Sequence, residues 1–106
     1  MTPEPRRGEV WLAQLDKVRP VIVLTRDPMG RHLNSVIVAP VTSTVRGLAT
    51  EVAVDHQDGV RRPSVANLDN VQLVARTSFL KPVGTARPLT LHAICAALAI
   101  AVDCEL

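Results

Sequence analysis

RPVIVLT at residues 19–25 and SVIVAPVT at residues 35–42 are the two stretches of this chain that decide its fold. Each contains four consecutive apolar residues. A strand with one face in solvent alternates apolar and polar residues, so these continuous runs predict strands that are buried on both faces. In a chain of 106 residues they favour a tight barrel, with a helix or a second subunit packed over its outside. Pro20 fits the first position of its strand, where no ladder hydrogen bond is yet required.

Shorter strands are expected on both sides of this pair. Residues 50–55 and 65–71 alternate apolar and polar side chains, which is typical of half-exposed strands. In the second segment Asn67 and Asp69 share one face, where both need solvent or partners. Together with segments at residues 8–15 and 82–86, they predict a mainly β protein.

The C-terminal segment predicts one helix over residues 90–103, with Thr90 as its N-cap. Leu91, Ile94, Leu98 and Val102 form one apolar face, and alanines make the rest nearly as apolar. A helix that is apolar all round is buried, and one small barrel cannot cover both of its sides. We therefore expect a homodimer, although alanine is also simply a good helix former.

Composition describes one small globular domain over residues 1–106. The chain is 47% hydrophobic and 21% charged, its net charge of +2 is mild, and its two aromatic residues are Trp11 and Phe79. Its start is polar, without the pattern of a signal peptide, and its longest apolar run, residues 91–102, is too short to span a bilayer. These features predict a cytoplasmic protein that does not enter a membrane.

Metal and cofactor signatures are missing from the sequence. The two cysteines, Cys95 and Cys104, form no CxxC pair, and His32, His56 and His92 are isolated. The sequence has no phosphate-binding glycine loop and no GxSxG turn. We therefore expect no metal site and no cofactor.

One pair of residues has side chains that can bind phosphate and an expected position side by side. Arg19 begins the first buried strand and Thr42 ends the second, so antiparallel pairing would bring both to one rim of the barrel. A guanidinium there can stabilise charge on a phosphorane, and a hydroxyl can hydrogen-bond a phosphate oxygen. On the residues alone, a structural role is favoured: Arg19 pairs with Asp16, and Thr42 satisfies a turn.

Several segments, in order along almost the whole chain, resemble the MazF/PemK-like ribonuclease toxins. The family opens with an RGxV-type strand, continues with RPV-hydrophobic and VxPLTS-type strands, and later has an SVxxxEQI strand. The corresponding segments here are Arg7–Trp11, RPVIVLTRD from Arg19, SVIVAPVTS from Ser35, Pro63–Val71, and Pro82–Gly84 with the final helix.

The resemblance implies an SH3-like barrel of antiparallel strands with a C-terminal helix, dimeric, in an α+β, mainly β class. It implies a metal-independent, sequence-specific endoribonuclease acting on single-stranded messenger RNA, with ribosomal or transfer RNA as other targets. It also implies a cognate MazE-like antitoxin whose acidic tail occupies the RNA groove. Arg19 and Thr42 match the catalytic pair; the substrate-binding positions are Asp16, Lys17, Ser43, Leu48, Asp69 and Asn70.

Three departures from the family pattern concern the substrate site. The loop before the arginine has shrunk to residues 16–18, Glu-Gln has become Asp69-Asn70, and the arginine that often follows is Gln72. We therefore expect a more open site with a different sequence preference.

The expected chemistry is attack of the RNA 2′-hydroxyl on the neighbouring phosphate, giving a cyclic phosphate and a 5′-hydroxyl. Arginine holds its proton above a pKa of about 12, so Arg19 is better suited to stabilise charge than to act as the base. Asp69, Asp16 and His32 remain candidate bases.

Two alternative functions have less support from the sequence. A gyrase-poisoning toxin of the CcdB type shares the fold but uses an aromatic-bearing C-terminal end, and this chain ends Asp103-Cys104-Glu105-Leu106. An SH3-like peptide-binding module would need aromatic side chains to line its groove.

Overall fold

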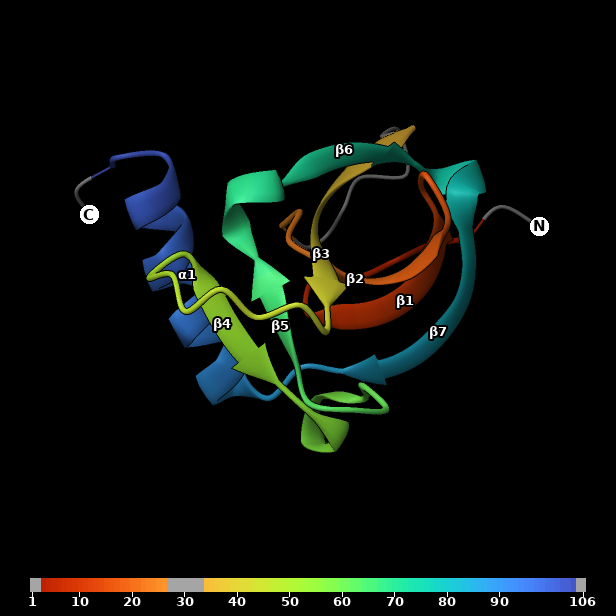
Figure 1. Ribbon diagram of the computed structural model, residues 1–106. Helices are drawn as coiled ribbons and strands as arrows, with labels where there is room; N and C mark the ends of the chain where they lie inside the picture. Colours follow the sequence, from red (N-terminus) through yellow and green to blue (C-terminus); the bar gives the residue numbers. More distant parts are fainter. Residues whose placement is uncertain (1–2, 27–33, 105–106) are drawn as a thin grey trace.

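A computed structural model describes residues 3–26 and 34–104 of the chain (Figure 1). Antiparallel strands curve into a small barrel, and the C-terminal helix lies at its side. Within these residues, three single-turn 3₁₀ helices connect strands, at His56–Asp58, Leu68–Asn70 and Arg76–Ser78. The strands are β1 (Glu9–Gln14), β2 (Val18–Val23), β3 (Ser35–Thr42), β4 (Glu51–Val54), β5 (Ser64–Asn67), β6 (Gln72–Ala75) and β7 (Phe79–Thr85), and the helix is α1 (Pro88–Ala101).

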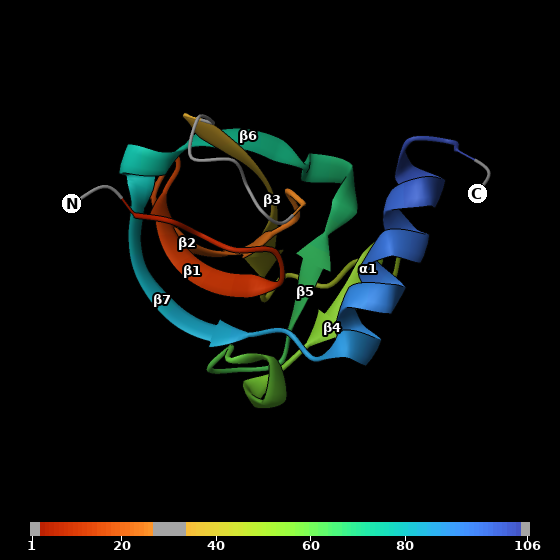
Figure 2. The ribbon, with the colours of Figure 1, turned by 180° about the vertical axis from the view of Figure 1, so that it is seen from behind.

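The strand order is β4-β5-β3-β2-β1-β7, and every pairing in it is antiparallel. Strand β3 is shared between two parts of the sheet: residues 35–38 pair with β6, and residues 41–42 pair with β5. It therefore joins the barrel to the β4–β5 hairpin, which carries α1 (Figure 2). The predicted small barrel of antiparallel strands with a C-terminal helix is confirmed.

Strand β2 is buried on both faces, as its apolar run predicts. Val21 and Val23 pack inside the barrel with Trp11 and Phe79, whose rings make an edge-to-face contact at 5.8 Å. Ile22 belongs to a second core, between the barrel, the β4–β5 hairpin and α1.

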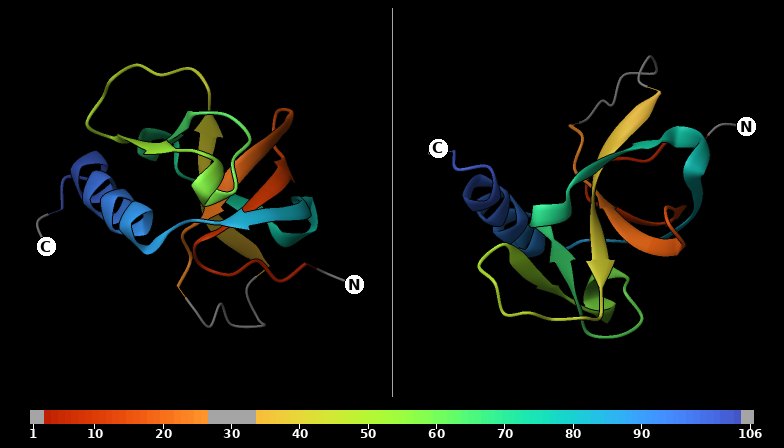
Figure 3. Two further views of the ribbon diagram at one scale, coloured as in Figure 1. Left: turned by 90° about the horizontal axis from the view of Figure 1, so that it is seen from below. Right: turned by 45° about the horizontal axis from the view of Figure 1, so that its top comes forward.

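The same prediction is wrong for one residue of β3. Ile37 is 44% exposed, beside Leu73 of β6, which is 68% exposed. Helix α1 packs on β4 and the 3₁₀ turn at Leu68–Asn70 but does not cover this part of the sheet (Figure 3). A continuous apolar run does not reveal where that cover ends.

The boundaries of α1 also differ from the prediction. The helix begins at Pro88, and Thr90 lies in its first turn, where its hydroxyl donates to the buried carboxylate of Asp58 instead of capping the helix. Thr90, Ile94 and Ala97 are buried, whereas Leu89 and Ile100 are exposed. This exposed face agrees with the expectation that one chain alone cannot cover both sides of the helix. In the part of the chain that is described, no helix is both long and apolar enough to cross a membrane.

The region around β5 and β6 departs most from the prediction. The expected strand over residues 65–71 ends at Asn67, because its side chain accepts a hydrogen bond from the Asp69 backbone N–H and turns the chain into a 3₁₀ helix. Asn67 and Asp69 are thus not neighbours on one strand face. Strand β6 follows without having been predicted, and β7 begins at Phe79, earlier than expected.

Candidate active site

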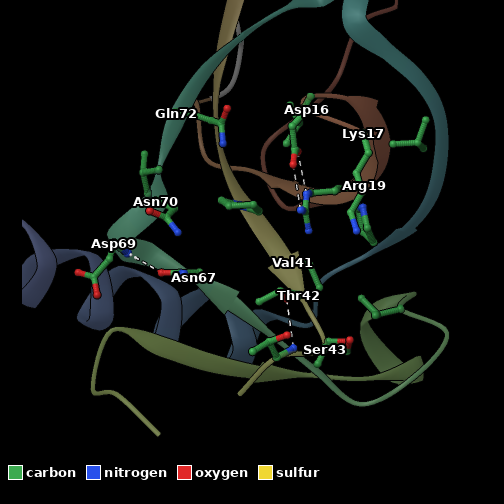
Figure 4. A pocket seen from close by; sticks show the side chains of 18 of the residues that line it. Asp16, Lys17, Arg19, Val41, Thr42, Ser43, Asn67, Asp69, Asn70 and Gln72 are labelled. Atoms are coloured by element: carbon green, nitrogen blue, oxygen red, sulfur yellow. Dashed lines mark hydrogen bonds and ion pairs between the residues drawn. The ribbon is translucent and has the colours of Figure 1, made fainter. Parts of the chain in front are cut away.

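A pocket of about 940 Å³ opens over the start of β2 and the end of β3. Its walls come from the β1–β2 turn, the end of β3, the loop between β4 and β5, and the segment from β5 to β6. Figure 4 shows Asp16, Lys17 and Arg19 on one side of it, and Asn67, Asp69, Asn70 and Gln72 on the other. Strand β3, which ends at Thr42 and is followed by Ser43, runs between the two sides.

Arg19 and Thr42 lie at the same end of two neighbouring strands, because β2 and β3 pair antiparallel. Val21 pairs with Pro40, and continuing this register by two residues places Arg19 opposite Thr42. Residues directly opposite one another in an antiparallel pair project to the same face of the sheet. Both side chains line the pocket, so the predicted juxtaposition is present.

The structural roles expected for these two residues are observed as well. Arg19 donates from Nε to Asp16 Oδ1 at 3.0 Å and from Nη2 to Asp16 Oδ2 at 3.1 Å. The hydrogen bond from Arg19 lowers the pKa of Asp16 to about 2, so its carboxylate is ionised at neutral pH. Thr42 Oγ1 accepts from the Thr44 backbone N–H at 3.1 Å, which orients the hydroxyl at the end of β3.

The side of the pocket facing Arg19 carries amides and one carboxylate. Asp69 accepts a hydrogen bond from the hydroxyl of the buried Thr50 at 2.5 Å, which fixes this carboxylate beside the 3₁₀ turn. Asn70 and Gln72 are exposed and line the pocket. Amide side chains present a donor and an acceptor together, the combination that reads the edge of a base.

Charge in the pocket favours an anionic ligand. Its lining includes two carboxylates, Asp16 and Asp69, and five basic side chains, namely Lys17, Arg19, Arg46, Arg61 and Arg62. Arginine binds phosphate through two parallel hydrogen bonds from its planar fork. Among the residues with a described structure, no group of three or more His, Cys, Asp or Glu could hold a metal ion.

Most of the predicted site residues share this one pocket. Asp16, Lys17, Ser43, Asp69 and Asn70 line it together with the Arg19–Thr42 pair. Leu48 is exposed on the β3–β4 loop and is not part of the lining, so its contact with substrate stays a prediction. His32 lies outside the described residues.

Sequence reasoning missed the pocket's far wall. Arg46, Arg61 and Arg62 line it, and their place there was not predictable, because loops carry no periodicity that indicates where they fold back. The Arg-Arg dipeptide ahead of Pro63 was a visible charge cluster, but its position beside the mouth of β2 is a tertiary fact.

Residues 6–102 match the family model described as "PemK-like, MazF-like toxin of type II toxin-antitoxin system". The chain belongs to this toxin family. The match spans every strand and the helix, so the pocket lies wholly within the toxin domain.

Relatives with names and structures agree with this assignment. The chain is 42% identical over 108 residues to a protein of Mycobacterium tuberculosis named "Probable endoribonuclease MazF5", covering 99% of both chains. It superimposes on the structure titled "Mycobacterium tuberculosis toxin MazF-mt6" with a TM-score of 0.88 and 42% identity, over 92% of this chain and 99% of that one. A second structure, "Endoribonuclease in complex with its cognate antitoxin from Mycobacterial species", gives a TM-score of 0.87 at 27% identity, over 96% and 98% of the two chains.

Proposed function

We propose that this endoribonuclease toxin cuts single-stranded RNA in the pocket between Arg19 and Asn70, at specific sequences and without a metal ion. The observation that carries the proposal is that Arg19 and Thr42 line one pocket that is rich in arginine. Cleavage of messenger RNA, with ribosomal or transfer RNA as further targets, would stop translation and growth.

The chemistry follows from the RNA itself. The 2′-oxygen bonds to the adjacent phosphorus, the bond from phosphorus to the 5′-oxygen breaks, and a 2′,3′-cyclic phosphate and a 5′-hydroxyl remain. The proton of the 2′-hydroxyl leaves to a base, and the departing 5′-oxygen gains a proton. Arg19 and Thr42 stabilise the extra negative charge on the phosphorane between these events.

The other side chains hold the strand. Lys17 and Ser43 contact phosphate and ribose beside the catalytic pair, and Asp69 and Asn70 contact bases on the facing side of the pocket. The toxin acts in the cytoplasm as a homodimer. A cognate MazE-like antitoxin inhibits it by laying an acidic segment in the same cationic pocket.

Substitution of Arg19 tests this function. Wild-type protein should cut RNA in excess chelator, and Arg19→Ala should lose about 100-fold or more in kcat, in line with the removal of one group that stabilises a transition state. Arg26→Ala is the matched control, because Arg26 is exposed and outside the pocket. Full activity of folded Arg19→Ala would refute the assignment.

Gyrase poisoning, the main alternative, is not favoured, because the family match is to MazF-like toxins and the relative is named an endoribonuclease. A supercoiling assay with purified gyrase, run beside the RNA digestion, separates the two activities. Inhibition of gyrase without RNA cleavage would reverse the conclusion.

A further inference from the structure

The contact between Arg19 and Asp16 uses only one edge of the guanidinium. Asp16 accepts from Nε and Nη2, which form the side-on edge of the arginine fork. Nη1 makes no hydrogen bond to any residue with a described structure. The end-on edge, formed by Nη1 and the second hydrogen of Nη2, therefore remains free to donate two parallel bonds.

We propose that Asp16 is a positioning residue: it holds the side-on edge of Arg19 so that the end-on edge stays fixed and free for the scissile phosphate. This inference rests on the proposed ribonuclease function and assigns Asp16 a role other than substrate contact or general base. Asp16 acts through Arg19 and touches no reacting atom.

The β1–β2 hairpin holds both members of the pair in place. Gln14 pairs with Val18, which leaves a turn of three residues, and the Leu15 backbone N–H donates to the Lys17 carbonyl within it. Arg19 pairs with the buried Ala13 of β1. The turn thus sets the reach from Asp16 to Arg19.

Two observations argue against other roles for Asp16. A general base works best with a pKa near the working pH, and the pKa of Asp16 is lowered to about 2 by the hydrogen bond from Arg19. The Asp16 side chain is also 69% exposed, and exposed ion pairs contribute little to folding stability. The pair is therefore better explained by the geometry it imposes on Arg19.

Kinetics of Asp16→Ala test the proposal. Because a misplacement of about 1 Å can cost about 100-fold in rate, we expect kcat to fall by roughly 10- to 100-fold with KM changed by less than about 3-fold. The acid limb of the pH–rate profile of Asp16→Ala should lie at the same pH as in wild-type protein, because Asp16 is not the general base. The control is Asp103→Asn, which removes an exposed charge at the end of α1, away from the pocket.

A double-mutant cycle shows whether Asp16 acts through Arg19. Lysine has no fork to orient, so Asp16→Ala added to Arg19→Lys should change kcat by less than about 2-fold. In wild-type protein, the Nε–H signal of Arg19 in an NMR spectrum should be protected from exchange, and Asp16→Ala should remove that protection.

Three results would overturn the role of Asp16. They are unchanged or increased activity of Asp16→Ala, a loss of the same size in the Arg19→Lys background, and an unprotected Arg19 Nε–H in wild-type protein. Failure of the wild-type protein to cut RNA would instead reject the proposed function. The two failures are therefore distinguishable.

Discussion

Asp58 is the residue on which the placement of α1 depends. Its carboxylate is fully buried and accepts from the Arg87 guanidinium, the Arg87 backbone N–H at 2.9 Å and the Thr90 hydroxyl at 2.8 Å. The loop after β4 is thereby tied to the first turn of the helix. Burial alone would raise the pKa of Asp58, but these hydrogen bonds outweigh it and lower the pKa to about 2.

The shifted pKa of Asp58 predicts acid sensitivity. An ordinary aspartate titrates near 3.8, so the stabilisation is complete above that pH and is lost as the pH falls toward 2. We expect the free energy of unfolding, measured by urea titration, to lose about 2 kcal/mol between pH 5 and pH 2 through this group. Asp58→Asn should show a smaller loss over the same range. An equal loss in both proteins would contradict the prediction.

Single residues were predictable where strand pairing fixes them. Arg19 and Thr42 could be placed together because Arg19 begins one strongly apolar run and Thr42 ends the next. Antiparallel pairing of the two strands then brings these two ends side by side. The Asp16–Arg19 pair was foreseen as the structural alternative, since the two are three residues apart. Thr90 was misread because a threonine that begins a helical pattern resembles an N-cap, and its real partner, Asp58, is distant in sequence.

At the scale of elements, apolar runs predicted strands well and short polar strands poorly. Strand β2 was recognisable because both of its faces meet apolar neighbours. Strand β6 was missed because it has only one buried residue, Val74, so its four residues carry no alternation to detect. The turn at Leu68–Asn70 was missed because it depends on one hydrogen bond, from the Asp69 backbone N–H to the Asn67 side chain.

The loop between β4 and β5 is predicted to extend the RNA site. Arg61 and Arg62 are exposed, line the pocket, and form no ion pair with any residue that the structure describes. Replacing both with alanine should weaken RNA binding several-fold. Since each phosphate contact on a single strand contributes about 0.7 to the slope of log K against log salt, the slope should fall by about 1.4.

The measurement is a salt titration of binding, using an RNA with a 2′-deoxy residue at the cleaved position so that it stays intact. The control replaces Arg26 and Lys81, which are exposed and outside the pocket. An equal change of slope in the two double variants would mean that general charge, and not this loop, binds the RNA.

For the whole molecule, the exposed face of α1 predicts association. Leu89, Ala93, Ala96 and Ile100 recur at helical spacing and are exposed in the single chain, Leu89 by 77% and Ile100 by 58%. We expect a dimer of twice the 11.5 kDa chain mass in sedimentation at micromolar concentration. Ile100→Lys should shift it to monomer, because a charge would be buried in the interface.

Leu80→Lys is the control for this experiment, since Leu80 is also an exposed apolar residue but lies on β7 and not on α1. Wild-type protein that sediments at 11.5 kDa, or a dimer that Ile100→Lys leaves intact, would show that this face of α1 is not the interface.

The central claim is that the RNA's own 2′-hydroxyl cleaves the RNA at the site formed by Arg19 and Thr42. Identifying the chemical groups at the ends of the RNA fragments tests this claim most directly. Purified wild-type protein is incubated with RNA in excess chelator, and the fragments are analysed by mass spectrometry. The mechanism predicts 2′,3′-cyclic phosphate on one fragment and 5′-hydroxyl on the other, with no cut where a 2′-deoxy residue replaces the attacking ribose. Fragments with 5′-phosphate and 3′-hydroxyl ends, or cleavage at the 2′-deoxy position, would contradict it.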